Sequence, residues 1–130
     1  MKRNIDFSRG LLIKAHNDMK VVAIGVEHDA PLDVMCFHLQ QAAEKLIKAL
    51  LASKNVNYPL THDLDVLIEH ALPLFPELVD FREPLLSFGP YAVEMRYDDE
   101  IYPEDDEVAE GQKTVLALAK IVERLVSGVR

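Results

Sequence analysis

The sequence contains one cysteine, no tryptophan and no long hydrophobic run. The single cysteine, Cys36, excludes an internal disulfide and fits a reducing compartment. The longest apolar run covers residues 21–26, far short of the roughly 20 residues that span a bilayer. The N-terminus also lacks the apolar stretch and cleavage site of a secretory signal. We therefore expect no membrane helix and a cytoplasmic location.

Basic residues are scarce as well. The chain has 14 lysines and arginines against 22 acidic residues, which gives a formal charge of -8, and the whole excess of acid lies in residues 66–130. Residues 98–107 include seven acids and no base. A nucleic-acid-binding protein normally gains affinity by neutralising phosphates with basic side chains. We therefore expect no DNA ligand, and any contact with a nucleotide has to be local.

The common motifs for catalysis and cofactors are missing too. The chain has no G-x-S-x-G, Walker or G-x-G-x-x-G sequence. No two of its histidines are spaced to bind one metal from a single helical turn, and they stand at positions 16, 28, 38, 62 and 70. Cys36 has no identifiable catalytic partner, so we interpret it as a small buried hydrophobe. The expectation is no catalytic residue of these types, no metal and no cofactor.

Apolar residues recur at intervals of three and four almost throughout, which predicts an all-helical fold. With 130 residues, the chain fits a single domain over residues 1–130. The expected helices cover residues 7–27, 31–53, 61–72, 91–97 and 104–127, with short proline-broken pieces between 73 and 90. Short connections favour an antiparallel up-and-down bundle of four or five helices.

Two of these helices carry more detailed expectations. The inward stripe of the first should contain Phe7, Leu11, Ala15, Met19, Val22 and Val26, with Asp6 or Ser8 as the N-cap. Thr61 is the expected N-cap of the third helix, and His62 and Asp63 are assigned to its start rather than to catalysis.

The helix over 31–53 has a stripe of nitrogen-bearing side chains. His38, Gln41, Lys45 and Lys48 follow each other at intervals of three, four and three, so they share a face. Such a face can hold a phosphate or nucleotide, with lysine acting as a point charge. The alternative is a solvated flank in which Glu44 and Lys48 form an ordinary ion pair one turn apart.

A second candidate site surrounds Arg96, which is followed by Tyr97 and Asp98. A guanidinium group can clamp a phosphate, and an adjoining tyrosine can stack on a base. The alternative is that Arg96 is neutralised by Asp99 or Glu100 as a structural pair. The acids that follow are expected to complement the dipole of the last helix, the alternative being a divalent-cation site.

Taken together, residues 37–51 (FHLQQAAEKLIKALL) resemble the second helix of HEPN domains. Thr61–Leu64, Arg96–Asp98 and a helix opening near Glu107 follow in the order and spacing of that family, over roughly residues 7–127. The pattern is similar to the prokaryotic HEPN proteins that accompany small nucleotidyltransferases. The resemblance implies a helical bundle that forms a homodimer with its arginine segments at a shared cleft.

Nuclease members of this family carry an arginine, four to six residues and then a histidine, and are taken to cleave RNA without metal. Arg96 matches the arginine, but Ile101, Tyr102 and Pro103 occupy the histidine positions, and no histidine follows. The resemblance therefore implies a non-catalytic nucleotide-binding or accessory subunit, with a small nucleotidyltransferase as partner. Its nucleotide site would combine Arg96, Tyr97 and Asp98 with His38, Lys45 and Lys48. Tyr97 and Tyr102 are candidates for adenylylation by such a partner.

Two alternatives remain open from the sequence. One is a metal-independent RNase toxin that combines Arg96 with Tyr102 or with His38. Tyr102 is a poor base because a free phenol has a pKa near 10, and the acidic run disfavours RNA. The other is a purely structural dimer without a ligand.

Overall fold

The structure is a computed structural model that describes residues 4–58, 60–88 and 104–128. Over these ranges the chain is helical without strands, as the apolar spacing predicts. The elements are α1 (Asn4–Glu27), α2 (Leu32–Ser53), α3 (Leu64–Ala71), the 3-10 helix η1 (Pro76–Phe81), α4 (Arg82–Leu86) and α7 (Asp105–Ser127). The helix expected over residues 91–97 lies outside the described residues.

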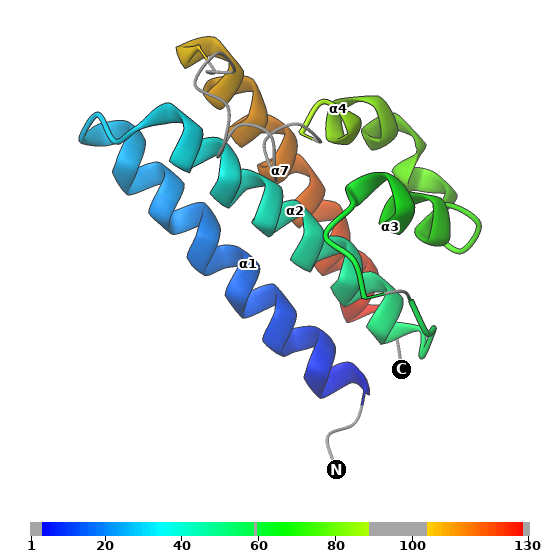
Figure 1. The fold of residues 1–130 in the computed structure, drawn as a ribbon. Coiled ribbons are helices and arrows are strands. Elements are labelled where there is room, and N and C mark those ends of the chain that lie inside the picture. Colours follow the sequence, from blue (N-terminus) through cyan, green and yellow to red (C-terminus); the bar gives the residue numbers. More distant parts are fainter. Residues whose placement is uncertain (1–3, 59, 89–103, 129–130) are drawn as a thin grey trace.

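Figure 1 shows the helices arranged as an up-and-down bundle. α1 and α2 form an antiparallel pair, and α7 runs alongside α2 in the same direction. α3, η1 and α4 lead back along the other side of α2 as short pieces, as the prolines between residues 73 and 90 predict. In the described ranges, none of the helices combines the length and apolar content needed to cross a bilayer.

α2 is the central element of the bundle. Its buried residues lie on nearly every side of the helix, because α1, α3 and α7 all pack against it. Five apolar residues spaced four and three apart along α2 are all buried: Met35, Leu39, Ala42, Leu46 and Ala49. Side chains that α2 directs at its neighbours are therefore held by rigid packing.

The expected inward face of α1 is partly wrong. Phe7 and Val26 are exposed, while Ser8 is fully buried and its hydroxyl donates to the Ala49 carbonyl oxygen at 2.7 Å. Asp6 and Ser8 both lie inside α1, which already includes Asn4, so the prediction of either as its N-cap is wrong. Ser8 faces the core because its small hydroxyl forms a hydrogen bond to α2, and Phe7 points toward solvent.

Both long N-terminal helices end in the same way. Asp29 and Asn55 adopt left-handed backbone conformations, with φ of 55° and 60°. The amide of the next residue then bonds back to the helix, from Ala30 to Gly25 at 2.8 Å and from Val56 to Leu51 at 3.1 Å. Asp and Asn tolerate this conformation better than most other residues with a side chain.

The third helix begins later than expected. Its N-cap is Asp63, whose carboxylate accepts from the Asp65 amide at 3.1 Å, so the prediction of Thr61 as N-cap is wrong. Thr61 instead accepts from the Asp63 amide at 3.0 Å and shapes the turn before the cap. The acids of the last helix do fall in its first turn, at Asp105, Asp106 and Glu107, where they complement the dipole.

Two glycines of α1 offer a matched stability test. A methyl group added at Gly10 would have no atom within 4 Å, so Gly10→Ala should stabilise the fold by about 0.5–1 kcal/mol through helix propensity. At Gly25 the same methyl group would overlap the Met35 sulfur and come within 3.0 Å of the Ala30 methyl carbon. Gly25→Ala should therefore lose that gain or destabilise. Urea unfolding measures both, and equal shifts would contradict the close approach at Gly25.

Candidate functional site

The predicted stripe on α2 meets two buried carboxylates. His38 and Lys45 both reach Asp18 of α1, whereas Lys48 reaches Glu44 on α2 itself. Asp18 and Glu44 are only 7% and 6% exposed. Because carboxylates are rarely buried without partners, the stripe supplies charge compensation inside the bundle.

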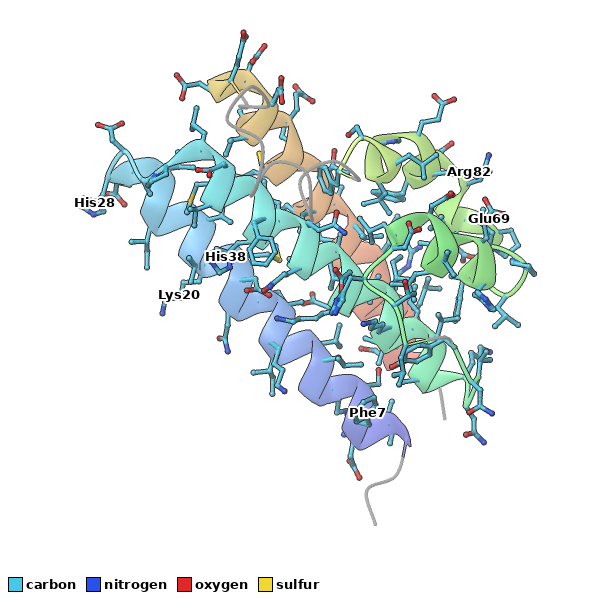
Figure 2. All side chains as sticks on the ribbon, in the orientation of Figure 1. Phe7, Lys20, His28, His38, Glu69 and Arg82 are labelled. Carbon is cyan, nitrogen blue, oxygen red and sulfur yellow. The ribbon has the colours of Figure 1, made fainter. Side chains whose placement is uncertain are left out.

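The first cluster joins α1 to α2. One Asp18 oxygen lies 3.0 Å from His38 Nδ1, and the other accepts from Lys45 Nζ at 2.6 Å. Figure 2 labels His38 on α2 beside α1. The side chains of His38 and Lys45 keep 26% and 28% of their surface exposed. The buried carboxylate therefore holds two partly accessible nitrogen groups side by side.

The contact with Asp18 fixes which histidine nitrogen carries the proton. A carboxylate accepts hydrogen bonds and cannot donate them, so His38 Nδ1 must be the N–H that faces Asp18. In the neutral ring, the proton-accepting lone pair is then on Nε2. An imidazole oriented in this way by a carboxylate is suited to accept a proton from a substrate hydroxyl.

The second cluster ties α2 to the segment that precedes α3. Glu44 forms an ion pair with Lys48, whose Nζ lies 3.6 Å from its carboxylate, and the same carboxylate oxygen lies 3.0 Å from His62 Nδ1. The predicted pair one turn apart is therefore present, with a histidine added from outside the helix. The His62 carbonyl oxygen also accepts from Gln40 Nε2 at 3.0 Å. His62 is thus fixed to α2 through both its ring and its backbone.

Gln40 leaves one polar atom unsatisfied. The residue is 1% exposed, and its side-chain oxygen has no hydrogen-bond partner within the described part of the chain. The amide orientation is nevertheless well determined, because turning it over would point two oxygens at each other across the His62 contact. The unused acceptor lies inside the packing between α2 and the segment before α3.

The electrostatic balance of the two clusters is close to neutral. Lys45 and Lys48 are each matched by a buried carboxylate within 4 Å. Each ammonium group has three N–H donors, and the pairs leave some of them for another acceptor. The described residues therefore provide donors for an anion but little net positive charge.

The structure places some of the predicted site residues and not others. His38 and Lys45 share Asp18, and Lys48 lies in the neighbouring cluster. Arg96, Tyr97 and Asp98 lie outside the described residues. Asp18 was missed by the sequence reasoning, although it interrupts the apolar seam between Ala15 and Val22 at intervals of three and four.

Cys36 shows no sign of a reactive thiol. It is 1% exposed on α2. Burial, helped by the nearby charges of Glu107 and Asp33, raises the pKa of its thiol from 9.0 to about 12. A thiol of this kind stays protonated near neutral pH and is a poor nucleophile. Among the described residues, no group of three or more potential metal ligands comes together either.

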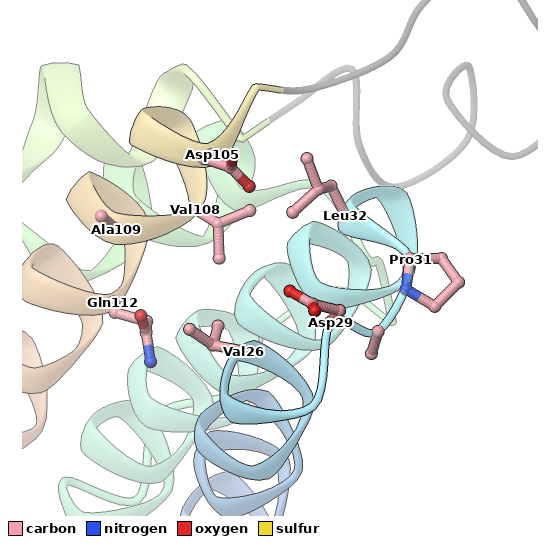
Figure 3. Close-up of a pocket in the computed structure, with 9 residues that line it drawn as sticks. Val26, Asp29, Pro31, Leu32, Asp105, Val108, Ala109 and Gln112 are labelled. Carbon is pink, nitrogen blue, oxygen red and sulfur yellow. The ribbon is translucent and has the colours of Figure 1, made fainter.

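A separate cavity of about 650 Å³ lies where α1 ends and α2 and α7 begin (Figure 3). Asp29 and Asp105 contribute carboxylates, and Val26, Leu32 and Val108 contribute apolar walls. Of the predicted site residues that the structure describes, His38, Lys45 and Lys48, none lines it. The cavity is therefore distinct from the polar clusters on α2.

Comparison with known proteins gives a consistent result. A family model described as "HEPN domain" matches residues 8–125. Among solved structures, the chain is similar to a crystal structure described as an archaeal HEPN homologue, with a TM-score of 0.73 and 19% sequence identity over 97% of this chain and 99% of that one. At this identity the likeness concerns the fold alone. No curated protein sequence matches the chain.

Proposed function

The chain belongs to the HEPN domain family, and from this premise we propose that it is a non-catalytic member that binds a nucleotide or serves a small nucleotidyltransferase as its accessory subunit. The observation that carries the proposal is the missing histidine: the last one in the sequence is His70, well before Arg96. A general acid or base contributes typically 10²–10⁴-fold to a reaction. Without that residue, the arginine segment is left to bind rather than to cleave.

The nucleotide is proposed to bind through its phosphates. Arg96 supplies the guanidinium, and Lys45 and Lys48 supply the N–H donors that their carboxylate pairs leave over. Since these pairs cancel most of the lysine charge, Arg96 has to provide the main attraction. In a homodimer, the arginine segments of two chains would share one cleft.

Calorimetry with ATP and GTP tests nucleotide binding. The natural chain is expected to bind one of them, and Arg96→Ala should weaken binding at least about tenfold through loss of a charge-assisted contact. Arg9→Ala, which removes the same charge from an exposed position on α1, is the matched control. Lys48→Met should weaken binding less than Arg96→Ala, because Glu44 already offsets Lys48.

Co-purification with a small nucleotidyltransferase encoded by a neighbouring gene tests the partner. A stable complex supports the accessory role. Absence of nucleotide binding together with absence of that complex, with Arg96→Ala behaving like the natural chain, would overturn the proposal and leave a purely structural bundle.

A second candidate function is favoured by one contact. Asp18 orients His38 so that Nε2 is free to accept a proton, and this arrangement would suit a metal-independent RNase in which His38 replaces the missing motif histidine. The base would take the proton of a ribose 2′-hydroxyl while Arg96 held the phosphate. The acidic run near Arg96 opposes RNA binding, so this candidate stands second.

Incubation with single-stranded and structured RNA separates the two candidates. The non-catalytic proposal predicts no cleavage above the level of a His38→Gln variant. Cleavage that His38→Gln abolishes and His28→Gln preserves would establish the RNase instead, since His28 is exposed at the end of α1. In that case Asp18→Asn should lower kcat more than it raises KM, because it changes the tautomer of His38.

A further inference from the structure

A groove runs between α1 and α7, away from the clusters on α2. It consists of the cavity in Figure 3 and a smaller one of about 180 Å³, and the two share Gln112 in their walls. α1 contributes Met19, Ala23 and Val26 to the walls, and α7 contributes Ala109 and Leu116. The two helices run antiparallel (Figure 1), and these residues line the same two cavities.

The groove has two different ends. At one end lie the carboxylates of Asp29 and Asp105. At the other, His16 of α1 pairs with Glu123 of α7 and joins the helices. The α7 wall from Asp105 to Leu116 is about 16 Å long at the helical rise of 1.5 Å per residue. That length equals about three turns of a helix lying in the groove.

The walls are apolar but open to water. Val26 is 45% exposed and Leu116 is 50% exposed, on opposite sides of the groove. Ala23 and Ala109 are small, which allows another backbone to come close to both helices. Apolar walls with small residues between two helices suit an amphipathic helix that inserts its apolar face.

The negative charge at the end formed by Asp29 and Asp105 indicates which kind of partner would bind in the groove. Asp29 and Asp105 favour a cation, and the chain as a whole carries a formal charge of -8. A second copy of this chain would add eight further negative charges, whereas a basic partner would be attracted. We propose that the groove docks an amphipathic helix of about three turns from a partner protein, with its apolar side chains between α1 and α7 and an arginine or lysine against Asp29 and Asp105. The inference depends on the proposed function only for the existence of a protein partner.

The test uses the full chain and two synthetic 12-residue helical peptides. Both carry the same stripe of leucine and alanine, and one ends in two arginines where the other ends in two glutamates. NMR titration should show at least tenfold tighter binding of the arginine peptide, with shifts centred on Ala23 and Leu116. Equal binding of both peptides, or shifts centred elsewhere, would overturn the proposal.

Matched variants locate the contact. Leu116→Glu should lower the affinity for the arginine peptide at least tenfold. Val79→Glu, at a 60% exposed position on η1, should leave this affinity unchanged. Asp29→Asn combined with Asp105→Asn should reduce the preference for arginine over glutamate to less than about threefold. A small change for Leu116→Glu would contradict the groove.

Three further outcomes separate the groove proposal from dimerisation and from the proposed function. A dimer in sedimentation that Leu116→Glu dissolves would make the groove an interface between copies and overturn the proposal. A nucleotidyltransferase that binds the Leu116→Glu variant as tightly as it binds the natural chain would also overturn the groove proposal, while supporting the proposed function. If the chain binds neither a nucleotide nor a nucleotidyltransferase but the groove still selects the arginine peptide, the proposed function fails and the groove stands.

Discussion

Replacement of Asp18 by alanine is expected to lower the free energy of unfolding by about 2–3 kcal/mol. Removal of one member of a buried ion pair typically costs about 3–5 kcal/mol of stability. The loss expected here is smaller, because His38 and Lys45 are partly exposed. In a chain of this length, the loss corresponds to a decrease in Tm of roughly 8–12 °C. Urea unfolding and calorimetry measure the effect.

Two comparisons show whether this loss comes from the cluster. Asp80→Ala removes a carboxylate from an exposed position on η1 and should change stability by less than about 0.5 kcal/mol. Adding Lys45→Met to Asp18→Ala should restore at least about 1 kcal/mol, because it removes the ammonium group left without its carboxylate. Equal effects of Asp18→Ala and Asp80→Ala would contradict the role of Asp18 in joining α1 to α2.

Cys36 of the folded chain is expected to react with iodoacetamide at pH 8 at least about 10³-fold more slowly than in the unfolded chain. Its pKa of about 12, against an ordinary 9.0, lowers the thiolate fraction by that factor, and only the thiolate reacts. Labelling followed by mass spectrometry, with and without denaturant, measures the ratio. Similar rates in both conditions would contradict the burial of the thiol.

The same shift in pKa gives a stability profile with a definite sign. The unfolded thiol loses its proton from about pH 9, whereas the folded thiol keeps it until about pH 12. The unfolded state therefore binds fewer protons over this interval, and stability should fall as the pH rises from 9 towards 12. Cys36→Ala should lack this component of the decline, which makes it the matched control.

The contacts that the sequence could predict are the local ones. The pair between Glu44 and Lys48 follows from helical spacing alone and is present. The same spacing correctly places His38 and Lys45 on one face. Their partner Asp18 comes from another helix, and no spacing rule within α2 gives the rotation of α1 that brings it there.

The wrong part of the predicted inward face of α1 also depends on contacts with another helix. Two neighbouring stripes of α1 share Ala15 and Val22, and they differ in whether Phe7 and Val26 or Ser8 and Gly25 face the core. Periodicity does not distinguish them, because the choice is made by the hydrogen bond from Ser8 to Ala49 and by the close packing at Gly25. The nucleotide site around Arg96 stays a prediction.

The central position of α2 has a consequence for how the chain unfolds. Because α1, α3 and α7 all pack on this helix, the backbone amides of its middle turns stay covered while the neighbouring helices stay in place. Hydrogen–deuterium exchange in α2 should therefore require global unfolding, whereas the ends of α1 and α7 exchange through local fraying. Any ligand that engages Lys45 or Lys48 thus binds to the last segment of the protein to lose its order.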